Sequence, residues 1–371
     1  MTTDSIPLRL EQVEVVYHRV ITAIQAVTLE VGERAIVALL GTNGAGKTTT
    51  LRAISGQARS PNSNVSRRRR SSSIRGFSIR RNVSCRRRHA ERISQRALMK
   101  LSGKVALVTG TSPNIGGGIA ETLAAEGAAV VCVDSRAENA ADCARYIKNT
   151  GARAIAVTCD VTEESQVVAA VRAARDAFDR IDILVNGAAF FNKKGVLDMT
   201  LDEWQRQLAV ILTGTFLFTK HVAKSMIEQR SKGNIINIIS TAGHQVEPDN
   251  IAYCTGKSGL LNFTRSAAME LVAHGIRVNS LTPTATDPAE SIERAVRWGR
   301  AVRANTDQLK RAFEPFRVRV PMQKLPSPSD YGRAVVFLAS DDSEMITGTD
   351  LRVDAGAIAQ YWAWDPASKR G

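Results

Sequence analysis

Apolar runs of strand length alternate with amphipathic segments of helix length from residue 99 to residue 371. A run such as Ile-Ile-Asn-Ile-Ile at 235–239 is typical of a strand that helices cover on both faces of a parallel sheet. The pattern predicts strands at 105–108, 129–133, 154–158, 183–185, 235–239, 277–281 and 350–353. It predicts helices near 116–127, 137–149, 163–178, 201–229, 251–274 and 328–340. We therefore expect an α/β fold with a doubly wound, seven-stranded parallel sheet of the Rossmann type.

The first 56 residues have a different pattern. Residues 8–17 alternate as a strand does, residues 34–40 form an apolar strand, and a helix is predicted at 48–55. The segment Gly41-Thr-Asn-Gly-Ala-Gly-Lys-Thr before this helix matches G-x-x-x-x-G-K-[ST] in full. In such a loop, backbone N–H groups hold phosphates, the lysine reaches the β- and γ-phosphate oxygens, and the last residue binds Mg²⁺. The predicted nucleotide-binding residues are Gly41, Gly44, Gly46, Lys47 and Thr48.

Residues 1–56 thus resemble the start of an ABC-transporter ATPase of the branched-chain amino-acid importer type. Tyr17 stands where that family stacks an aromatic ring on adenine. The resemblance ends near Gly56, since the chain has no L-S-G-G-Q signature, no apolar strand ending in Asp-Glu and no switch histidine. Without the acidic residue that orders Mg²⁺ and water, phosphoryl transfer has no means of activation. We predict a truncated P-loop fragment.

Arginine and serine dominate residues 57–98. Twelve arginines and one glutamate lie between residues 67 and 96, a local charge of +11, so 14 − 11 = +3 of the chain's net charge of +14 remains for all other residues. Such a composition buries too little apolar surface to fold, and we predict a disordered basic connector. It is either an electrostatic tether to nucleic acid or an anionic membrane, or non-native sequence that joins an interrupted ATPase gene to a second gene. We expect no specific nucleic-acid partner.

Candidate catalytic residues lie between Ser240 and Lys257. Tyr253 and Lys257 are four residues apart, so they share one face of the predicted helix. An ammonium group beside a phenol lowers the phenol's pKa from about 10 toward neutrality. A tyrosine tuned in this way exchanges a proton with a substrate oxygen near neutral pH, and Ser240 can hold that oxygen in place.

A second group of residues indicates a dinucleotide. The segment Thr109-Gly-Thr-Ser-Pro-Asn-Ile-Gly-Gly-Gly follows the first strand of the sheet and opens a helix, where a tight glycine turn lets a pyrophosphate sit on the helix N-terminus. Asp134 ends the second strand, 24 residues after Gly110. A carboxylate there accepts hydrogen bonds from ribose hydroxyls and repels a 2′-phosphate, which favours NAD over NADP. Arg136 partly offsets this preference.

Because of these residues, the region 99–371 resembles the short-chain dehydrogenase/reductase family. The spacing of Ser240, Tyr253 and Lys257 matches that of the family's catalytic serine, tyrosine and lysine. Asn114 replaces a glycine of the family's turn, and we expect it to tolerate a left-handed conformation there. The resemblance implies hydride transfer between an alcohol and a carbonyl, a homo-oligomer (dimer or tetramer) and a small-molecule alcohol or ketone substrate. The cofactor-binding residues that it implies are Gly110, Ser112, Asn114, Ile115, Gly116, Asp134, Asp160, Val161, Asn186, Ala188, Tyr253, Lys257, Pro283 and Thr286.

The chain departs from the family at two positions. Ile211 stands where the family has an asparagine that anchors a proton-relaying water, so we expect slower proton exchange with solvent. Thr284 replaces a glycine after Pro283, and Thr286 is expected to contact the nicotinamide amide. The segment 289–324 is the expected substrate lid, and its arginines either form a solvated face or bind a substrate carboxylate or phosphate.

These observations predict three regions, at 1–56, 57–98 and 99–371, and an NAD-dependent oxidoreductase with a Ser-Tyr-Lys active site. The alternatives are a dinucleotide-binding module with weak or no catalysis and an ATP-binding, transporter-associated fragment. The five cysteines show no C-x-x-C spacing, which indicates free thiols, no metal site and a reducing cytoplasm. No apolar run approaches the ~18 residues of a membrane span.

Overall fold

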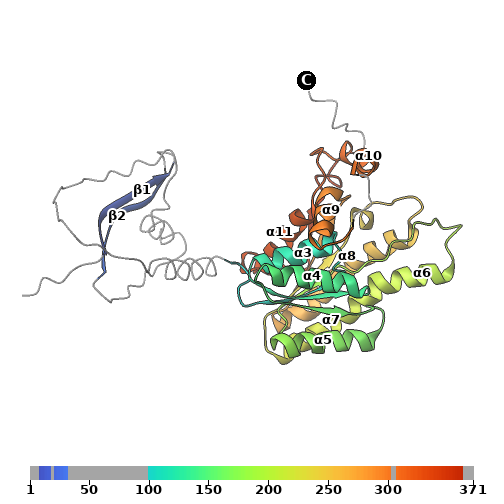
Figure 1. The fold of residues 1–371 in the computed structure, drawn as a ribbon, viewed down its shortest axis with the longest axis horizontal. Helices are drawn as coiled ribbons and strands as arrows, with labels where there is room; N and C mark the ends of the chain where they lie inside the picture. Colours follow the sequence, from blue (N-terminus) through green and yellow to red (C-terminus); the bar gives the residue numbers. More distant parts are fainter. Residues whose placement is uncertain (1–7, 18–20, 32–98, 302–305, 362–371) are drawn as a thin grey trace, which may run out of the picture. The chain divides into compact units, whose positions relative to one another are not determined.

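The computed structural model describes residues 8–17, 21–31, 99–301 and 306–361 (Figure 1). The chain divides into two compact units, Met1–Arg81 and Asn82–Gly371. In the first unit, strands β1 (Leu8–Tyr17) and β2 (Ile21–Val31) pair antiparallel. The strand predicted at 8–17 is confirmed, and β2 was not predicted. The glycine-rich loop with Lys47, the strand predicted at 34–40 and the connector lie outside the described residues.

A seven-stranded parallel sheet organises the second unit, as predicted. Its strands are β3 (Val105–Thr109), β4 (Ala129–Asp134), β5 (Ala154–Thr158), β6 (Ile183–Asn186), β7 (Asn234–Ile238), β8 (Arg277–Pro283) and β9 (Asp350–Val353). Their order is β5-β4-β3-β6-β7-β8-β9. The order reverses between β3 and β6, and in a sheet of this kind ligands bind in the crevice outside the carboxyl ends of the strands at the reversal.

Helices cover both faces of the sheet (Figure 1). They are α3 (Ile115–Ala125), α4 (Ala137–Asn149), α5 (Glu164–Phe178), α6 (Leu201–Leu208), α7 (Gly214–Glu228), α8 (Ile251–Leu271), α9 (Pro288–Arg297), α10 (Thr306–Arg317) and α11 (Pro328–Ala339). The prediction of a single helix at 201–229 is wrong, because a π-helical segment, Ala209–Thr213, separates α6 from α7. Helices α9 and α10 form much of the expected lid. No described helix is long and apolar enough to cross a membrane.

Two apolar layers explain the unbroken hydrophobic runs. Ala106 and Val108 of β3 pack into a layer with α3, α4 and α11, whereas Val105 and Leu107 pack into a layer with α5, α7 and α8. Because both faces of the strand are buried, its first four positions, 105–108, are all apolar, and only Thr109 at its end is polar. Four of the five cysteines are described, and all four are buried free thiols, as expected.

Helices α3 and α11 approach closely at two glycines. A Cβ atom on Gly118 would lie 2.4 Å from Cβ of Pro328, and one on Gly332 would lie 2.2 Å from Oγ1 of Thr122. This contact holds α3, and therefore the turn that precedes α3, against α11.

We expect Gly118→Ala to lower the free energy of unfolding by about 1–3 kcal/mol, because the rigid proline ring cannot move away from the added methyl group. Urea denaturation measures the change. Gly259→Ala is the matched control, since it also lies in a helix, and the nearest atom to its Cβ would be a terminal methyl of Leu212, at 3.1 Å. Equal stability of the Gly118→Ala variant and the wild type would contradict this account of the α3–α11 contact.

Candidate active site

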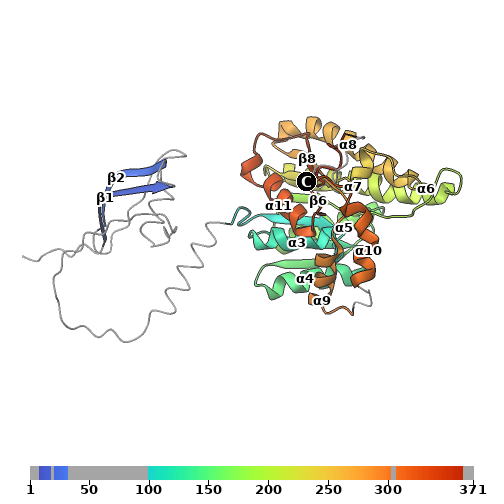
Figure 2. The ribbon, with the colours of Figure 1, turned by 90° about the horizontal axis from the view of Figure 1, so that it is seen from above.

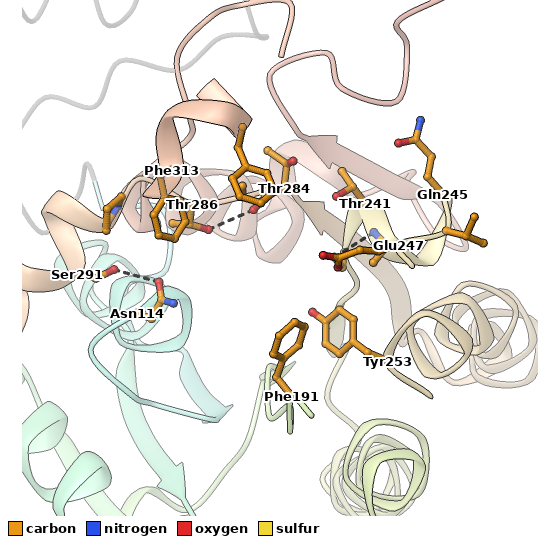
Figure 3. Close-up of a pocket in the computed structure, with 16 residues that line it drawn as sticks. Asn114, Phe191, Thr241, Gln245, Glu247, Tyr253, Thr284, Thr286, Ser291 and Phe313 are labelled. Carbon is orange, nitrogen blue, oxygen red and sulfur yellow. Dashed lines mark hydrogen bonds between the residues drawn. The ribbon is translucent and has the colours of Figure 1, made fainter. Parts of the chain in front are cut away.

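A cavity of about 500 Å³ opens at the carboxyl ends of the central strands (Figure 3). Its walls come from the turn before α3, the loops after β6, β7 and β8, the first turn of α8, and the lid helices. The described residues that line it are Asn114, Phe191, Ser240, Thr241, Ala242, Gln245, Val246, Glu247, Tyr253, Thr284, Ala285, Thr286, Pro288, Ser291, Phe313 and Phe316. The cavity therefore lies where a doubly wound sheet binds its ligands.

The structure brings Ser240, Tyr253 and Lys257 together. Ser240 lies just beyond β7, where its Oγ accepts a hydrogen bond from the Ala242 N–H at 3.1 Å and its hydroxyl also hydrogen-bonds Tyr253. The Tyr253 ring lies in the first turn of α8 and meets the Phe191 ring edge-on, with centroids 5.1 Å apart. Lys257 is buried, its Nζ donates to the Ile238 carbonyl at 2.6 Å, and it lies 5.7 Å from the Tyr253 ring centroid.

Burial shifts the pKa of both groups. Burial raises the pKa of Tyr253, and repulsion by the nearby Glu247 carboxylate adds to this, whereas the Ser240 hydrogen bond opposes it. Burial also lowers the pKa of Lys257 to about 8. The expected lowering of the Tyr253 pKa by Lys257 is therefore not found. The reason is geometric, because the Lys257 amine points at a backbone carbonyl instead of the phenol oxygen.

Ile211 lies in the π-helical segment and is fully buried. It packs with Ile239 and Leu260, and the Tyr253 ring borders this cluster. Its backbone carbonyl accepts a hydrogen bond from Oγ1 of Thr215 at 2.7 Å. The position is thus occupied by hydrocarbon, which offers no side-chain partner to a water molecule.

The glycine turn after β3 is built for a close backbone approach. Gly110 has φ of +78°, and a Cβ there would lie 2.9 Å from Cα of Ala188. A Cβ on Gly116 would lie 2.0 Å from the Gly110 carbonyl oxygen. Oγ1 of Thr109 accepts hydrogen bonds from the N–H groups of Gly187 and Ala188 at 3.0 and 3.2 Å. Only glycine fits at 110 and 116, because a Cβ atom at either position would strike the backbone of the turn or of the loop after β6.

Asn114 is the N-cap residue of α3, with φ of −92°. The turn therefore does not use the left-handed conformation that asparagine was expected to tolerate there. Its side chain does not cap the helix. Instead, its Oδ1 accepts a hydrogen bond from Oγ of Ser291 at 3.0 Å, which ties the turn to α9. Ser112 lies in the turn, and Ile115 begins the helix, so both border the N-terminus of α3.

Asp134 is held rigidly at the end of β4. Its Oδ1 accepts hydrogen bonds from the Arg136 N–H at 2.9 Å and from Nδ2 of Asn139 at 3.1 Å. Asn139 in turn accepts a hydrogen bond from Arg300, beyond α9, at 2.9 Å. The Arg136 side chain is exposed. The buried carboxylate therefore has a fixed position at the edge of the crevice.

The other expected cofactor residues follow the strand ends. Oδ1 of Asp160, after β5, accepts hydrogen bonds from the N–H and hydroxyl of Thr162, and Val161 is buried beside it. Asn186 is also buried, and its Nδ2 donates to Asn237 at 2.9 Å, so its amide supports the sheet. Pro283 ends β8. Oγ1 of Thr286 lines the cavity and lies 3.3 Å from the Tyr331 hydroxyl.

Four of the lid arginines are paired with carboxylates. Arg294 is 1% exposed and contacts Glu121 at 3.0 Å and Glu290 at 2.6 Å. Arg300 contacts Asp142 at 2.6 Å, and Arg317 pairs with Glu314. Arg294 is therefore not on a solvated face. The ion pairs of Arg294 and Arg300 hold α9 and the residues after it over α3 and α4 (Figure 2).

Several cavity residues were missed by the sequence analysis. Glu247 lies between Ser240 and Tyr253 in the chain, and this position between two candidate catalytic residues could have identified it as a residue of the site. Phe313 and Phe316 come from a helix that the pattern did not predict. His244 is not among the lining residues, since its Nε2 lies 3.0 Å from Oγ1 of Thr282 and 3.2 Å from Oδ2 of Asp350. Trp362 and Trp364 lie outside the described residues.

Comparison with known proteins gives two family matches. Residues 110–357 match the model described as enoyl-(acyl carrier protein) reductase. Residues 24–153 match the ABC transporter model, further than the end predicted near Gly56. The two matches overlap from 110 to 153, where the structure has α3, β4 and α4 of the parallel-sheet unit.

Relatives of known activity cover most of the second unit. The chain is 36% identical to a 3-oxoacyl-[acyl-carrier-protein] reductase of Synechocystis sp., over 70% of this chain and 98% of the relative. It is 36% identical to a galactitol 2-dehydrogenase of Agrobacterium fabrum, with the same coverage. Among solved structures, NAD⁺-bound xylitol dehydrogenase is 33% identical with a TM-score of 0.61, covering 68% of this chain and 98% of that one.

The low pKa of Lys257 predicts a stability that depends on pH. Its pKa is about 8 in the folded protein, against 10.5 for a free lysine, so between these values the folded state binds fewer protons than the unfolded state. The contribution of Lys257 to the free energy of unfolding therefore rises as pH increases through this window, by about 2 kcal/mol between roughly pH 7.5 and 9.5. Burial raises the pKa of the Cys159 thiol to about 11, which opposes the rise, so the Lys257 contribution is the difference between the wild type and a variant without the amine.

Guanidinium denaturation at both pH values measures this rise. Lys257→Met keeps the apolar stem but removes the amine, so it should lack the rise, whereas the exposed control Lys148→Met should keep it. The same pH dependence in wild type and Lys257→Met would show that Lys257 does not titrate in this window.

Proposed function

The chain belongs to the short-chain dehydrogenase/reductase family, and on this premise we propose that residues 99–371 form an NAD-dependent oxidoreductase that interconverts an alcohol and a carbonyl compound. The observation that carries the proposal is the cluster of Ser240, Tyr253 and Lys257 at the cavity. Bound nicotinamide supplies or accepts the hydride. The chain's residues bind the reactants, orient them and move the proton.

Tyr253 is the proton-transfer group in this proposal. Because burial holds its pKa above the usual value, its hydroxyl carries a proton at neutral pH. It can donate that proton to a carbonyl oxygen that becomes an alkoxide during reduction, and it takes the proton back during oxidation. Ser240 hydrogen-bonds the same oxygen and keeps it within reach of the phenol.

Lys257 supports this transfer from beneath the ring. Its buried amine is tied to the Ile238 carbonyl, so it does not need a charged partner within the protein. An ammonium group at this place attracts the phenolate that remains after proton donation, and we expect it also to bind the nicotinamide ribose.

The crevice fits the dinucleotide through this chain's own residues. Gly110 and Gly116 allow the tight turn that sets the N-terminus of α3 at the crevice, where a pyrophosphate can bind, and Asp134 offers a fixed carboxylate to the adenosine ribose. The NAD⁺ bound to the xylitol dehydrogenase relative supports the same cofactor for this chain.

The charge of Asp134 predicts a preference for NADH over NADPH. Asp134→Asn keeps the shape and an oxygen acceptor but removes the charge that repels a 2′-phosphate, so the ratio of the Kd of NADPH to that of NADH should fall about tenfold or more, ~1.4 kcal/mol. Titration calorimetry measures both constants. Asp176→Asn, on the exposed face of α5, should leave the ratio unchanged. Tighter binding of NADPH than of NADH by the wild type would overturn the preference.

The role of Tyr253 predicts the effect of removing one hydroxyl group. Tyr253→Phe keeps the ring and its contact with Phe191, so NADH affinity should change little, whereas kcat should fall by about 10²–10⁴. Tyr146→Phe, on α4, is the matched control and should retain activity. Assay of reduced nicotinamide absorbance on a reacting alcohol gives kcat.

A Tyr253→Phe variant with near wild-type kcat would exclude Tyr253 as the proton donor. A second candidate function is a dinucleotide-binding protein with slow turnover, and the observation that favours it is the apolar surrounding of Ile211. Wild-type protein that binds NADH but turns over neither alcohols nor ketones would favour this second function.

A further inference from the structure

Glu247 is the only charged residue among the described residues that line the cavity, and it lies beside Tyr253 (Figure 3). Its charge contributes to the raised pKa of Tyr253, so its carboxylate is close to the place where the substrate oxygen reacts. Four arginines of the lid, Arg294, Arg297, Arg300 and Arg317, are engaged with other carboxylates, and no described arginine lines the cavity. The charge that a bound substrate meets is therefore negative.

The Glu247 carboxylate is ionised and held in place. Burial acts to raise its pKa, but hydrogen bonds from Lys193 and Asn250 outweigh this and keep the pKa below the usual value. Nζ of Lys193 lies 2.7 Å from Oε1, and Nδ2 of Asn250 lies 2.8 Å from Oε2. A carboxylate has about four lone-pair positions, so two acceptor positions remain after these bonds.

An ionised carboxylate accepts hydrogen bonds and donates none. It therefore selects a substrate with a donor next to the reacting carbon and repels one with a carboxylate or phosphate there. The chain of a 3-oxoacyl thioester presents only carbonyl acceptors near the reacting ketone, which a carboxylate opposes. Because the Lys193 ammonium group already balances the charge of the Glu247 carboxylate, the substrate does not need to carry a positive charge.

The other lining residues fit the same kind of ligand. Thr241, Gln245 and Thr284 are neutral groups that both donate and accept hydrogen bonds, as hydroxyl groups need. Phe191, Phe313 and Phe316 offer apolar surface to the C–H groups of a short carbon chain. A cavity of about 500 Å³ has room for such a molecule beside the nicotinamide.

We propose that the substrate is a small neutral polyol, or the hydroxyketone made from it, and that Glu247 accepts a hydrogen bond from the hydroxyl group on the carbon next to the reacting one. This inference rests on the proposed oxidoreductase function. In oxidation, the C–H bond of the reacting carbon breaks and its electron pair leaves with the hydride to NAD⁺. Tyr253 must first lose its own proton to solvent; its phenolate then takes the hydroxyl proton, and a C=O bond forms.

The test compares substrates that differ near the reacting carbon. Full-length protein with NAD⁺ is assayed on xylitol, on butan-2-ol, which lacks the neighbouring hydroxyl, on lactate, which carries an anion there, and on 1-aminopropan-2-ol, which carries a cation. We expect kcat/KM for xylitol to exceed that for butan-2-ol and that for lactate by about 10- to 100-fold, the effect of one hydrogen bond to a charged group. The ammonium group of 1-aminopropan-2-ol can also donate to Glu247, so for this substrate we expect only that kcat/KM does not exceed that for xylitol, because Lys193 already balances the carboxylate charge.

Glu247→Gln then tests the residue itself. It should lower kcat/KM for xylitol by about 10- to 100-fold relative to butan-2-ol, raise kcat/KM for lactate, and leave NADH affinity unchanged. Any change in the Tyr253 pKa affects both substrates alike, so its effect cancels in the ratio of their kcat/KM values. Glu228→Gln, an exposed residue of α7, is the matched control and should leave the ratio unchanged.

Three outcomes would overturn the proposal. Equal kcat/KM for xylitol and butan-2-ol, or an unchanged ratio in Glu247→Gln, would remove the polyol inference and leave the oxidoreductase function standing. Preference for 1-aminopropan-2-ol or lactate would replace the polyol by a charged substrate. No turnover of any alcohol or ketone by the wild type would remove the oxidoreductase function and this inference together.

Discussion

The close approach of β3 to the loop after β6 is the constraint on which the rest of the site depends. Oγ1 of Thr109 accepts two backbone N–H groups of that loop, and Gly110 lies where any Cβ would strike Ala188. The strand order reverses between β3 and β6, so the chain segments that follow these two strands lead away from each other and a crevice opens between them. Neighbouring strands β7 and β8 then bring Ser240 and Thr286 to the same edge.

Burial affects the protonation states of the titratable side chains in this crevice more than ion pairing does. It raises the pKa of Tyr253 and lowers that of Lys257, so both shifts disfavour the charged form. Glu247 keeps its charge because two side chains hydrogen-bond it. The site therefore presents a protonated phenol and one ionised carboxylate to the substrate, and a buried lysine amine with a pKa of about 8 lies near the phenol ring.

The sheet was predictable because strands buried on both faces leave unbroken apolar runs, and the Ser240–Tyr253–Lys257 cluster was predictable because helix periodicity places residues four apart on one face. Other features depend on residues distant in the chain. The Lys257 amine points at the Ile238 carbonyl because it donates a hydrogen bond to it. Arg294 can be buried because it forms an ion pair with Glu121. The π-helical segment around Ile211 leaves no mark in the hydrophobic pattern, and helix periodicity alone does not reveal it.

The central claim is that the carbon held beside Tyr253 exchanges a hydride directly with a nicotinamide. Reduced nicotinamide dinucleotide with deuterium at the transferred C4 position tests it, with a reacting ketone and mass spectrometry of the alcohol product. The account predicts one deuterium per product molecule on the carbinol carbon, and none on that carbon when the deuterium is supplied by the solvent instead. Deuterium on the carbinol carbon that comes from solvent, or a product without the cofactor's label, would contradict it.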